Sequence, residues 1–210
     1  MPEWTELLRK AATIFAIIDP IGAVAIFISL TRGQTAREQK RTAAVTCLSM
    51  AAVLIASMLV GERILWFFGI GIPAFQIGGG IILLFVALDM LNARRPGMKG
   101  TSREEAEAEE RDTVAVVPLA VPILAGPGSI TAVIIESHSA ETPLLSALLL
   151  AVIVGISLFT WLVFRLASPI SAMLGRTGLN VVTRLMGLLL AAISIEIIAV
   201  GLKGLFPILN

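Results

Sequence analysis

Charged side chains are scarce in this chain, and four long stretches lack them altogether. Only 15% of the 210 residues are charged, whereas a soluble globular domain has about a quarter. No Asp, Glu, Lys or Arg occurs in residues 42–61, 64–88, 113–135 or 142–164. At about 1.5 Å per helical residue, each stretch can cross a hydrocarbon core of roughly 30 Å. The missing charge therefore excludes a soluble domain and predicts membrane-spanning helices.

Two further apolar stretches carry very little charge. Residues 11–31 contain only Asp19, and residues 181–203 contain Arg184, Glu196 and, at the last position, Lys203. With these two, the sequence predicts an all-α, polytopic membrane protein with six transmembrane helices. The lipid bilayer is its expected partner.

Other absences exclude further classes of function. Cys47 is the only cysteine, so neither an intramolecular disulfide nor dithiol redox chemistry is available. The chain has no Gly-x-x-x-x-Gly-Lys-Ser/Thr motif, so ATP does not power it directly. We expect no cofactor, no metal and no nucleic-acid partner.

The distribution of Lys and Arg predicts an orientation in the membrane. Twelve of the sixteen fall on one side of the six expected spans, and only Arg9, Lys10, Arg63 and Lys203 fall on the other. Short cytoplasmic loops carry the excess of basic residues. Both termini, and the loop 136–141 with His138, are therefore expected outside an inner (plasma) membrane.

The chain resembles itself at an offset of 107 residues. Pro20 matches Pro127, Asp89 matches Glu196, and two glycine pairs keep the same offset: Gly71 with Gly178, and Gly80 with Gly187. We therefore divide the chain into a first three-helix repeat at 1–91, a cytoplasmic linker at 92–112 and a second repeat at 113–210. Because three helices is an odd number, the second repeat must be inverted. Inverted repeats are typical of secondary transporters.

The first helix of the first repeat is predicted to be discontinuous. Pro20 has no N–H and cannot continue the preceding helix. It suits the first position of a new helix, with Asp19 as the N-cap. An ionisable side chain within a transmembrane segment indicates function, although a proline kink with a capping carboxylate is the structural alternative.

The helix that opens the second repeat is also predicted to be interrupted, with a different chemistry. Pro118, Pro122 and Pro127 disfavour a continuous helix, which restarts at residues 126–129 (GPGS). No carboxylate stands there, so the N–H groups of residues 128–130 are expected to be free for an anion. A purely structural break is again the alternative.

Together the two breaks predict a small zwitterionic substrate. Asp19 would take an ammonium group, and the second break would take a carboxylate. Glycines in the third helix favour a small ligand, although close helix packing explains them equally well. The predicted substrate-binding residues are Asp19, Pro20, Gly22, Gly78, Gly79, Gly126, Pro127, Gly128 and Ser129.

Two acids are candidates for proton coupling. Asp89 and Glu196 occupy matched places in the third and sixth expected helices, and buried acids in transporters often carry protons. Asp89 has the alternative of ending its helix beside Asn92.

Three strings resemble the MarC family, also called UPF0056. They are residues 19–22 (DPIG), 118–130 (PLAVPILAGPGSI) and 184–192 (RLMGLLLAA), and the resemblance covers nearly the whole chain. It implies a six-helix inner-membrane protein, related to the lysine-exporter superfamily, with some members transporting glycine and alanine in a proton-coupled manner. This chain departs from the family pattern at Ala23, where Asn is common, and at Asp89 and Glu196, where amides are common.

The sequence therefore predicts a secondary transporter of small neutral amino acids, not an enzyme, with a homo-oligomer left open. The first alternative is a non-transporting membrane partner or a stress-related structural protein. The second is an intramembrane hydrolase that uses Ser129 and His138, although no hydrolase-type glycine follows Ser129.

Overall fold

The computed structural model describes residues 2–31, 33–92, 120, 124–140 and 142–206, and all regular structure within them is helical. The helices are α1 (Pro2–Ile18), α2 (Ala23–Leu30), α3 (Ala36–Phe67), α4 (Ile72–Leu91), α6 (Pro127–His138), α7 (Pro143–Arg165) and α8 (Ala167–Leu205). The expected linker at 92–112 lies outside the described residues except for Asn92.

Five described segments are long and apolar enough to span a membrane. They are Thr5–Leu30, which includes the break between α1 and α2, Ala36–Phe67, Ile72–Leu91, Pro143–Arg165 and Thr177–Leu205. The chain is therefore a multi-pass membrane protein, as predicted. Of the sixth expected span, 113–135, the structure describes residue 120 and the part from 124 onward, which includes most of α6.

Local sequence signals set most helix starts. Thr35 caps α3 through a reciprocal pair of hydrogen bonds: its Oγ1 accepts from Glu38 N at 3.3 Å, and its N donates to Glu38 Oε2 at 2.7 Å. Thr142 Oγ1 accepts from Leu145 N at the start of α7. α4, α6 and α7 each have proline in the first two positions, where a missing N–H costs nothing.

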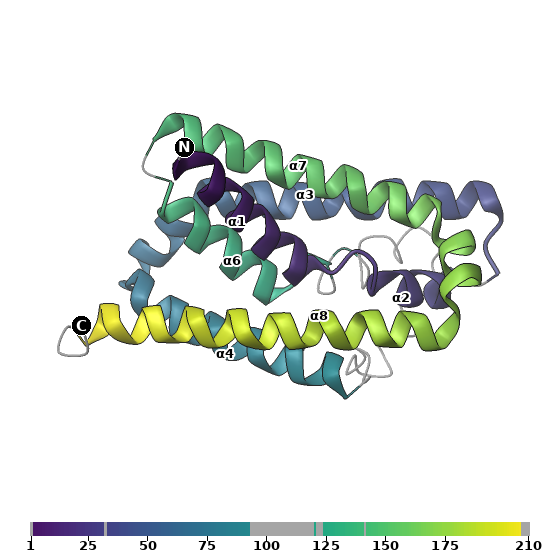
Figure 1. Ribbon diagram of the computed structural model, residues 1–210. Coiled ribbons are helices and arrows are strands. Elements are labelled where there is room, and N and C mark those ends of the chain that lie inside the picture. The colour runs from purple at the N-terminus through teal and green to yellow at the C-terminus, as the bar shows by residue number, and fades with distance from the viewer. Residues whose placement is uncertain (1, 32, 93–119, 121–123, 141, 207–210) are drawn as a thin grey trace.

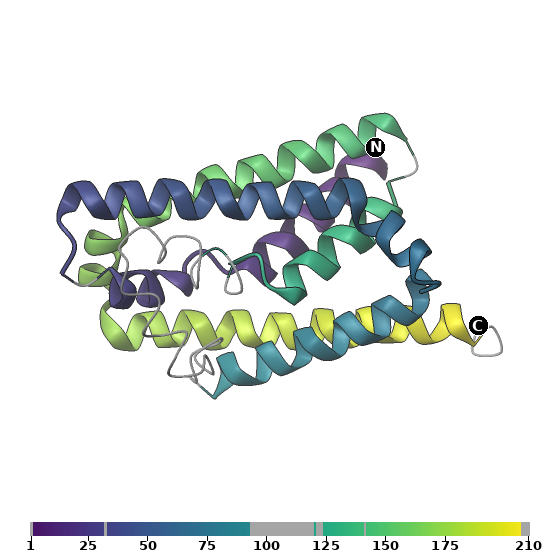
Figure 2. The same ribbon diagram turned by 180° about the vertical axis from the view of Figure 1, so that it is seen from behind.

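The helices form three layers (Figure 1). α3 and α7 lie side by side in one outer layer, α4 and α8 form the other, and α1, α2 and α6 lie between them. Figure 2 shows the same layers from behind, with the first and last described residues at one end of the bundle. The shorter helices on either side of the two breaks are thus enclosed by the longer ones.

α4 and α8 approach closely through a regular run of small residues. A Cβ added at Gly80 would lie 3.0 Å from Ser194 O, one at Gly187 would lie 3.1 Å from Ala87 O, and one at Gly201 would lie 2.7 Å from Pro73 O. The contacts therefore repeat every seven residues on both helices, in an antiparallel register. Small residues allow such close backbone packing in membranes. This explains Gly80 and Gly187 as packing residues.

Two apolar clusters hold the middle layer in place. The larger joins residues of α1, α2 and α6 to α3, α7 and the start of α8, and includes Ile18, Phe27, Met50, Leu124 and Ile153. The smaller joins Ile17 of α1 and Ala132 of α6 to buried residues of α4 and α8. The interrupted helices are therefore packed on both sides.

Candidate functional site at two helix breaks

The first break is formed by residues 19–22 between α1 and α2. Asp19 N still donates to Phe15 O at 3.0 Å, so α1 continues hydrogen bonding up to the proline. Asp19 itself has φ +43, a left-handed conformation that Asp adopts more readily than most residues. α2 begins only at Ala23, with Gly22 before it. The expectation of a helix restart at Pro20 is therefore wrong by three residues.

The Asp19 carboxylate closes this break. Its Oδ1 accepts a hydrogen bond from Gly22 N at 3.1 Å, because the turn leaves that N–H without a helical partner. A Cβ at Gly22 would overlap the carboxylate. Asp19, Pro20 and Gly22 therefore act as one local unit, and Asp19 caps the turn before α2 instead of the helix itself.

The second break immediately precedes α6, where the sequence predicts it. Gly126 stands before the helix, and Pro127 occupies its first position. The Ser129 hydroxyl donates to Leu124 O at 2.7 Å and to Gly126 O at 3.2 Å, which satisfies carbonyls on the preceding side. Pro118 and Pro122 lie outside the described residues.

Two backbone donors at the second break have no acceptor among the described residues. They are the N–H groups of Gly128 and Ser129, which belong to the first turn of a helix and have no intrahelical partner. Ile130 N, by contrast, donates to Gly126 O at 3.0 Å. The expectation of three free donors is therefore wrong for Ile130.

The two breaks lie next to one another inside the bundle. A Cβ at Gly128 would lie 3.8 Å from Cγ2 of Ile17, in the last turn of α1, and 2.5 Å from Leu83 Cδ2 of α4. Ile18 shares an apolar cluster with Leu124 and Ala125. The two interrupted helices, α1 and α6, therefore meet at their breaks.

The neighbouring glycines Gly78 and Gly79 differ in their surroundings. A Cβ at Gly79 would overlap the Thr131 side chain of α6, whereas nothing lies within 4 Å of one at Gly78. Gly78 is exposed on the surface of α4. The structure therefore brings Gly79 to the second break and leaves Gly78 away from it. Close packing accounts for both Gly79 and Gly128.

Asp89 and Glu196 are not part of the interior. Both side chains are exposed on the surface of the α4–α8 pair. α4 and α8 pack together through the helix faces that carry Gly80, Gly187 and Gly201. Asp89 and Glu196 lie on other faces, so neither acid points into the contact between the helices. The expectation that these two acids are buried within the chain is therefore wrong, and their role in coupling stays a prediction.

Asp19 is the acid that the fold encloses. Its exposed fraction is 8%, and the one hydrogen bond that its carboxylate accepts within the described part of the chain comes from Gly22 N. No ion pair reaches it from the described residues. A carboxylate without a cation is costly in such surroundings, so this position suits a proton or a cationic ligand.

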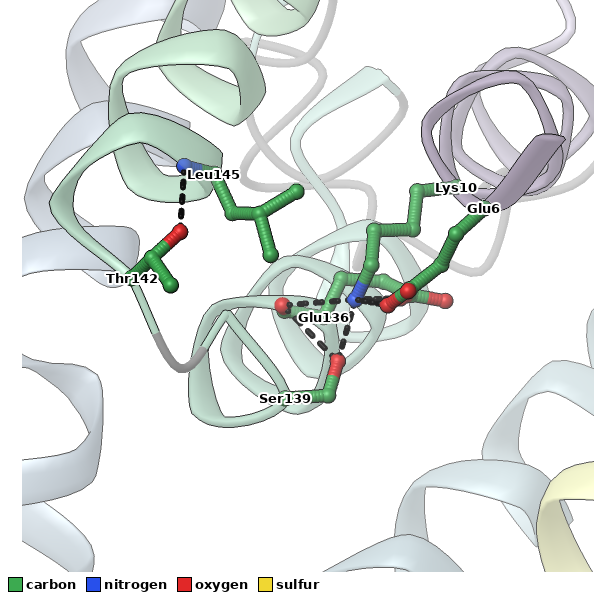
Figure 3. Close-up of polar contacts among 6 residues, drawn as sticks. All are labelled: Glu6, Lys10, Glu136, Ser139, Thr142 and Leu145. Carbon is green, nitrogen blue, oxygen red and sulfur yellow. Dashed lines mark hydrogen bonds and ion pairs between the residues drawn. The ribbon is translucent and has the colours of Figure 1, made fainter. Parts of the chain in front are cut away.

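Sequence reasoning missed a buried cation in the middle of α1. Lys10 is 2% exposed, and its Nζ forms ion pairs with Glu136 Oε2 at 3.0 Å and with Glu6 Oε1 at 3.4 Å. It also donates to Glu136 O at 3.3 Å and to the Ser139 hydroxyl. Figure 3 shows the amino group held among these oxygens. The spacing of Glu6 and Lys10 on one helix signals half of this cluster, but nothing in the sequence signals Glu136.

His138 also lies where the sequence did not place it. It is the last residue of α6, not part of a loop, and its Nδ1 lies 2.9 Å from Glu62 Oε1 of α3. Nine helical residues, about 13 Å along the axis, separate it from Ser129. The structure therefore does not form the Ser129–His138 pair that the hydrolase alternative requires.

Comparison with known proteins gives a consistent family match. The family model described as "MarC family integral membrane protein" matches residues 4–206. A UPF0056 membrane protein of Escherichia coli, YhcE, is 40% identical over 92% of this chain and 90% of its own length. A UPF0056 membrane protein of Methanocaldococcus jannaschii is 39% identical over 92% and 94%, and YvbG of Bacillus subtilis is 37% identical over 94% of both chains. No solved structure matches.

Proposed function

Since the chain belongs to the MarC family of integral membrane proteins, we propose that it is a secondary transporter of small neutral amino acids such as glycine and alanine, acting in an inner membrane. The two adjacent helix breaks carry this proposal. One offers the enclosed Asp19 carboxylate. The other offers the first-turn N–H groups of Gly128 and Ser129 beside the positive end of the α6 dipole.

The pairing of these ends suits a zwitterion better than a simple anion or cation. An ammonium group would neutralise Asp19, and a carboxylate would accept from the α6 donors. Ile17, Ile18, Leu83 and Leu124 surround the breaks with apolar atoms, which suits a neutral side chain better than a charged one. Small neutral amino acids fit this description.

An inverted repeat would explain why the breaks face each other. At the offset of 107 residues α2 corresponds to α6, α3 to α7 and α4 to α8, and in Figures 1 and 2 the two helices of each pair run in opposite directions. Glycines with positive φ form corresponding corners, with Gly69 before α4 and Gly175 inside α8. We therefore propose that the two halves are related by a pseudo-two-fold axis in the membrane plane, with both termini outward.

Proton coupling, if it drives transport, would act through Asp19 in this proposal. It is the acid enclosed beside the second break, whereas Asp89 and Glu196 are exposed. Protonation and an ammonium group would compete for the same carboxylate. Binding of the substrate's ammonium group would then displace the proton from Asp19.

A three-ligand comparison tests the proposal directly. Thermal stability of the detergent-solubilised protein is measured with alanine, with ethylamine and with propionate, because a ligand stabilises the state that binds it. Alanine should raise Tm, and the two analogues, each lacking one charge, should not. Uptake of labelled alanine into proteoliposomes should follow. Absence of both binding and uptake across the small neutral amino acids would instead favour a non-transporting membrane partner.

A further inference from the structure

The buried cluster around Lys10 joins the middle of α1 to the end of α6 that lies far from the breaks. Lys10 precedes Asp19 by nine residues, and Glu136 follows Pro127 by nine residues. Each therefore lies about 13 Å from its break along its own helix. α1 and α6 touch at the breaks through Ile17 and Gly128, and they touch again at the Lys10–Glu136 ion pair.

One face of α6 connects these two contacts. Gly128, Ala132 and Glu136 are spaced four residues apart, so they lie above one another on the helix. Gly128 adjoins Ile17 of α1, and Glu136 pairs with Lys10 of α1. Ala132, between them, is 1% exposed. α1 and α6 are therefore in contact at both ends of this seam, and the α6 residue between the two contacts is buried.

The chemistry of this end differs from that of the rest of the seam. A buried ion pair seldom adds net stability over a well-packed apolar pair, but it fixes one arrangement, and losing one partner strongly disfavours that arrangement. Lys10 also donates to Glu136 O and to the Ser139 hydroxyl at the C-terminal end of α6. We therefore expect the hydrogen bonds and ion pairs of Lys10 to form together and to break together.

We propose that the Lys10–Glu136 pair is a latch that closes the outward end of the seam between α1 and α6, and that its release opens a path to the two breaks. This inference rests on the proposed transport function, since a transporter needs such a path. The structure represents the latched state. The outward side is the one with few basic residues.

The test measures solvent access to the seam without using any substrate. The reporter is Ala132→Cys in a Cys47→Ala background, which has no other cysteine. Its reaction with a charged, membrane-impermeant thiosulfonate is followed in purified protein in detergent, where the reagent reaches both ends of the bundle. The result therefore depends on neither membrane orientation nor transport.

Lys10→Met and Glu136→Gln should each raise the labelling rate at least tenfold. Glu62→Gln is the matched control, because it removes the Glu62–His138 pair, which ties the same end of α6 to α3 and is exposed. It should leave the rate unchanged. An unchanged rate in Lys10→Met, or an equal rise in Glu62→Gln, would overturn the latch.

Exchanging the charges of Lys10 and Glu136 distinguishes loss of the ion pair from misfolding of the variant. Lys10→Glu should label fast, and Lys10→Glu with Glu136→Lys should return to the slow parental rate, because the pair is restored with reversed sign. Fast labelling in the double variant, with a monodisperse chromatographic peak, would also overturn the latch. Alanine uptake by the parent is scored separately, so failure of the transport proposal is distinguishable from failure of the latch.

Discussion

The two helix breaks occupy matched places in the sequence but satisfy their backbone in opposite ways. At the first, the Asp19 carboxylate accepts from the N–H that follows the turn. At the second, the Ser129 hydroxyl donates to the carbonyls that precede the helix. The first break therefore presents the negative charge of Asp19, and the nearby Gly22 N–H is already hydrogen-bonded. The second presents backbone N–H donors, and the nearby carbonyls of Leu124 and Gly126 are already hydrogen-bonded.

The breaks also differ in what holds them. Position 22 must be glycine because a Cβ there would overlap the Asp19 carboxylate. The first break is therefore stabilised by contacts among its own residues. Gly128 and Thr131 of the second break are held against Leu83 and Gly79 of α4, so that break depends on tertiary packing. Positions that match at the offset of 107 residues therefore differ in chemistry and in the origin of their stability.

Asp19→Asn should produce the largest change in ligand binding. Asn keeps an oxygen that can accept from Gly22 N but removes the charge. A hydrogen bond to a charged group contributes about 1.5 to 3 kcal/mol, so affinity for alanine should fall roughly ten- to hundredfold. Isothermal titration in detergent measures the affinity. An affinity unchanged within twofold would reduce Asp19 to a structural cap.

Gly79→Ala should destabilise the protein by about 1 to 3 kcal/mol, the usual cost of overpacking a core. The added methyl would overlap Thr131, whose branched side chain has little freedom. Gly78→Ala is the adjacent control, because its methyl meets open space, and it should change stability by less than about 0.5 kcal/mol. Thermal melting of both variants measures the difference. Equal melting temperatures would show that α4 does not support the second break.

Sequence patterns located both breaks because proline and its neighbours act locally. Pro20 and Pro127 end hydrogen-bonding ladders wherever they stand, so their effect was predictable. The exposure of Asp89 and Glu196 was not, because the direction of each side chain depends on the α4–α8 register, which the glycines at 80, 187 and 201 fix jointly. Lys10 was missed for a similar reason: its partner Glu136 lies 126 residues away.

Ser129→Ala should affect stability more than binding. It removes the hydrogen bonds to Leu124 O and Gly126 O and leaves buried carbonyls without that donor, at a cost of roughly 1 kcal/mol. The proposed carboxylate donors are backbone N–H groups, which alanine retains, so alanine affinity should stay within about threefold. A loss of affinity comparable to that of Asp19→Asn would assign the hydroxyl itself to the ligand.

Glu196→Gln should have the smallest effect, since Glu196 is exposed on α8 and does not face the breaks. Proton-driven alanine uptake into proteoliposomes with an imposed pH gradient should stay within about twofold of the parent, as should uptake by Asp89→Asn. Asp19→Asn should lose the response to the gradient, because it removes the enclosed acid. The opposite pattern, with accumulation lost in Glu196→Gln but exchange of internal for external alanine retained, would identify Glu196 as the proton carrier. It would place coupling on the outer face of the α4–α8 pair, and the first break would then keep only its role in holding the ligand.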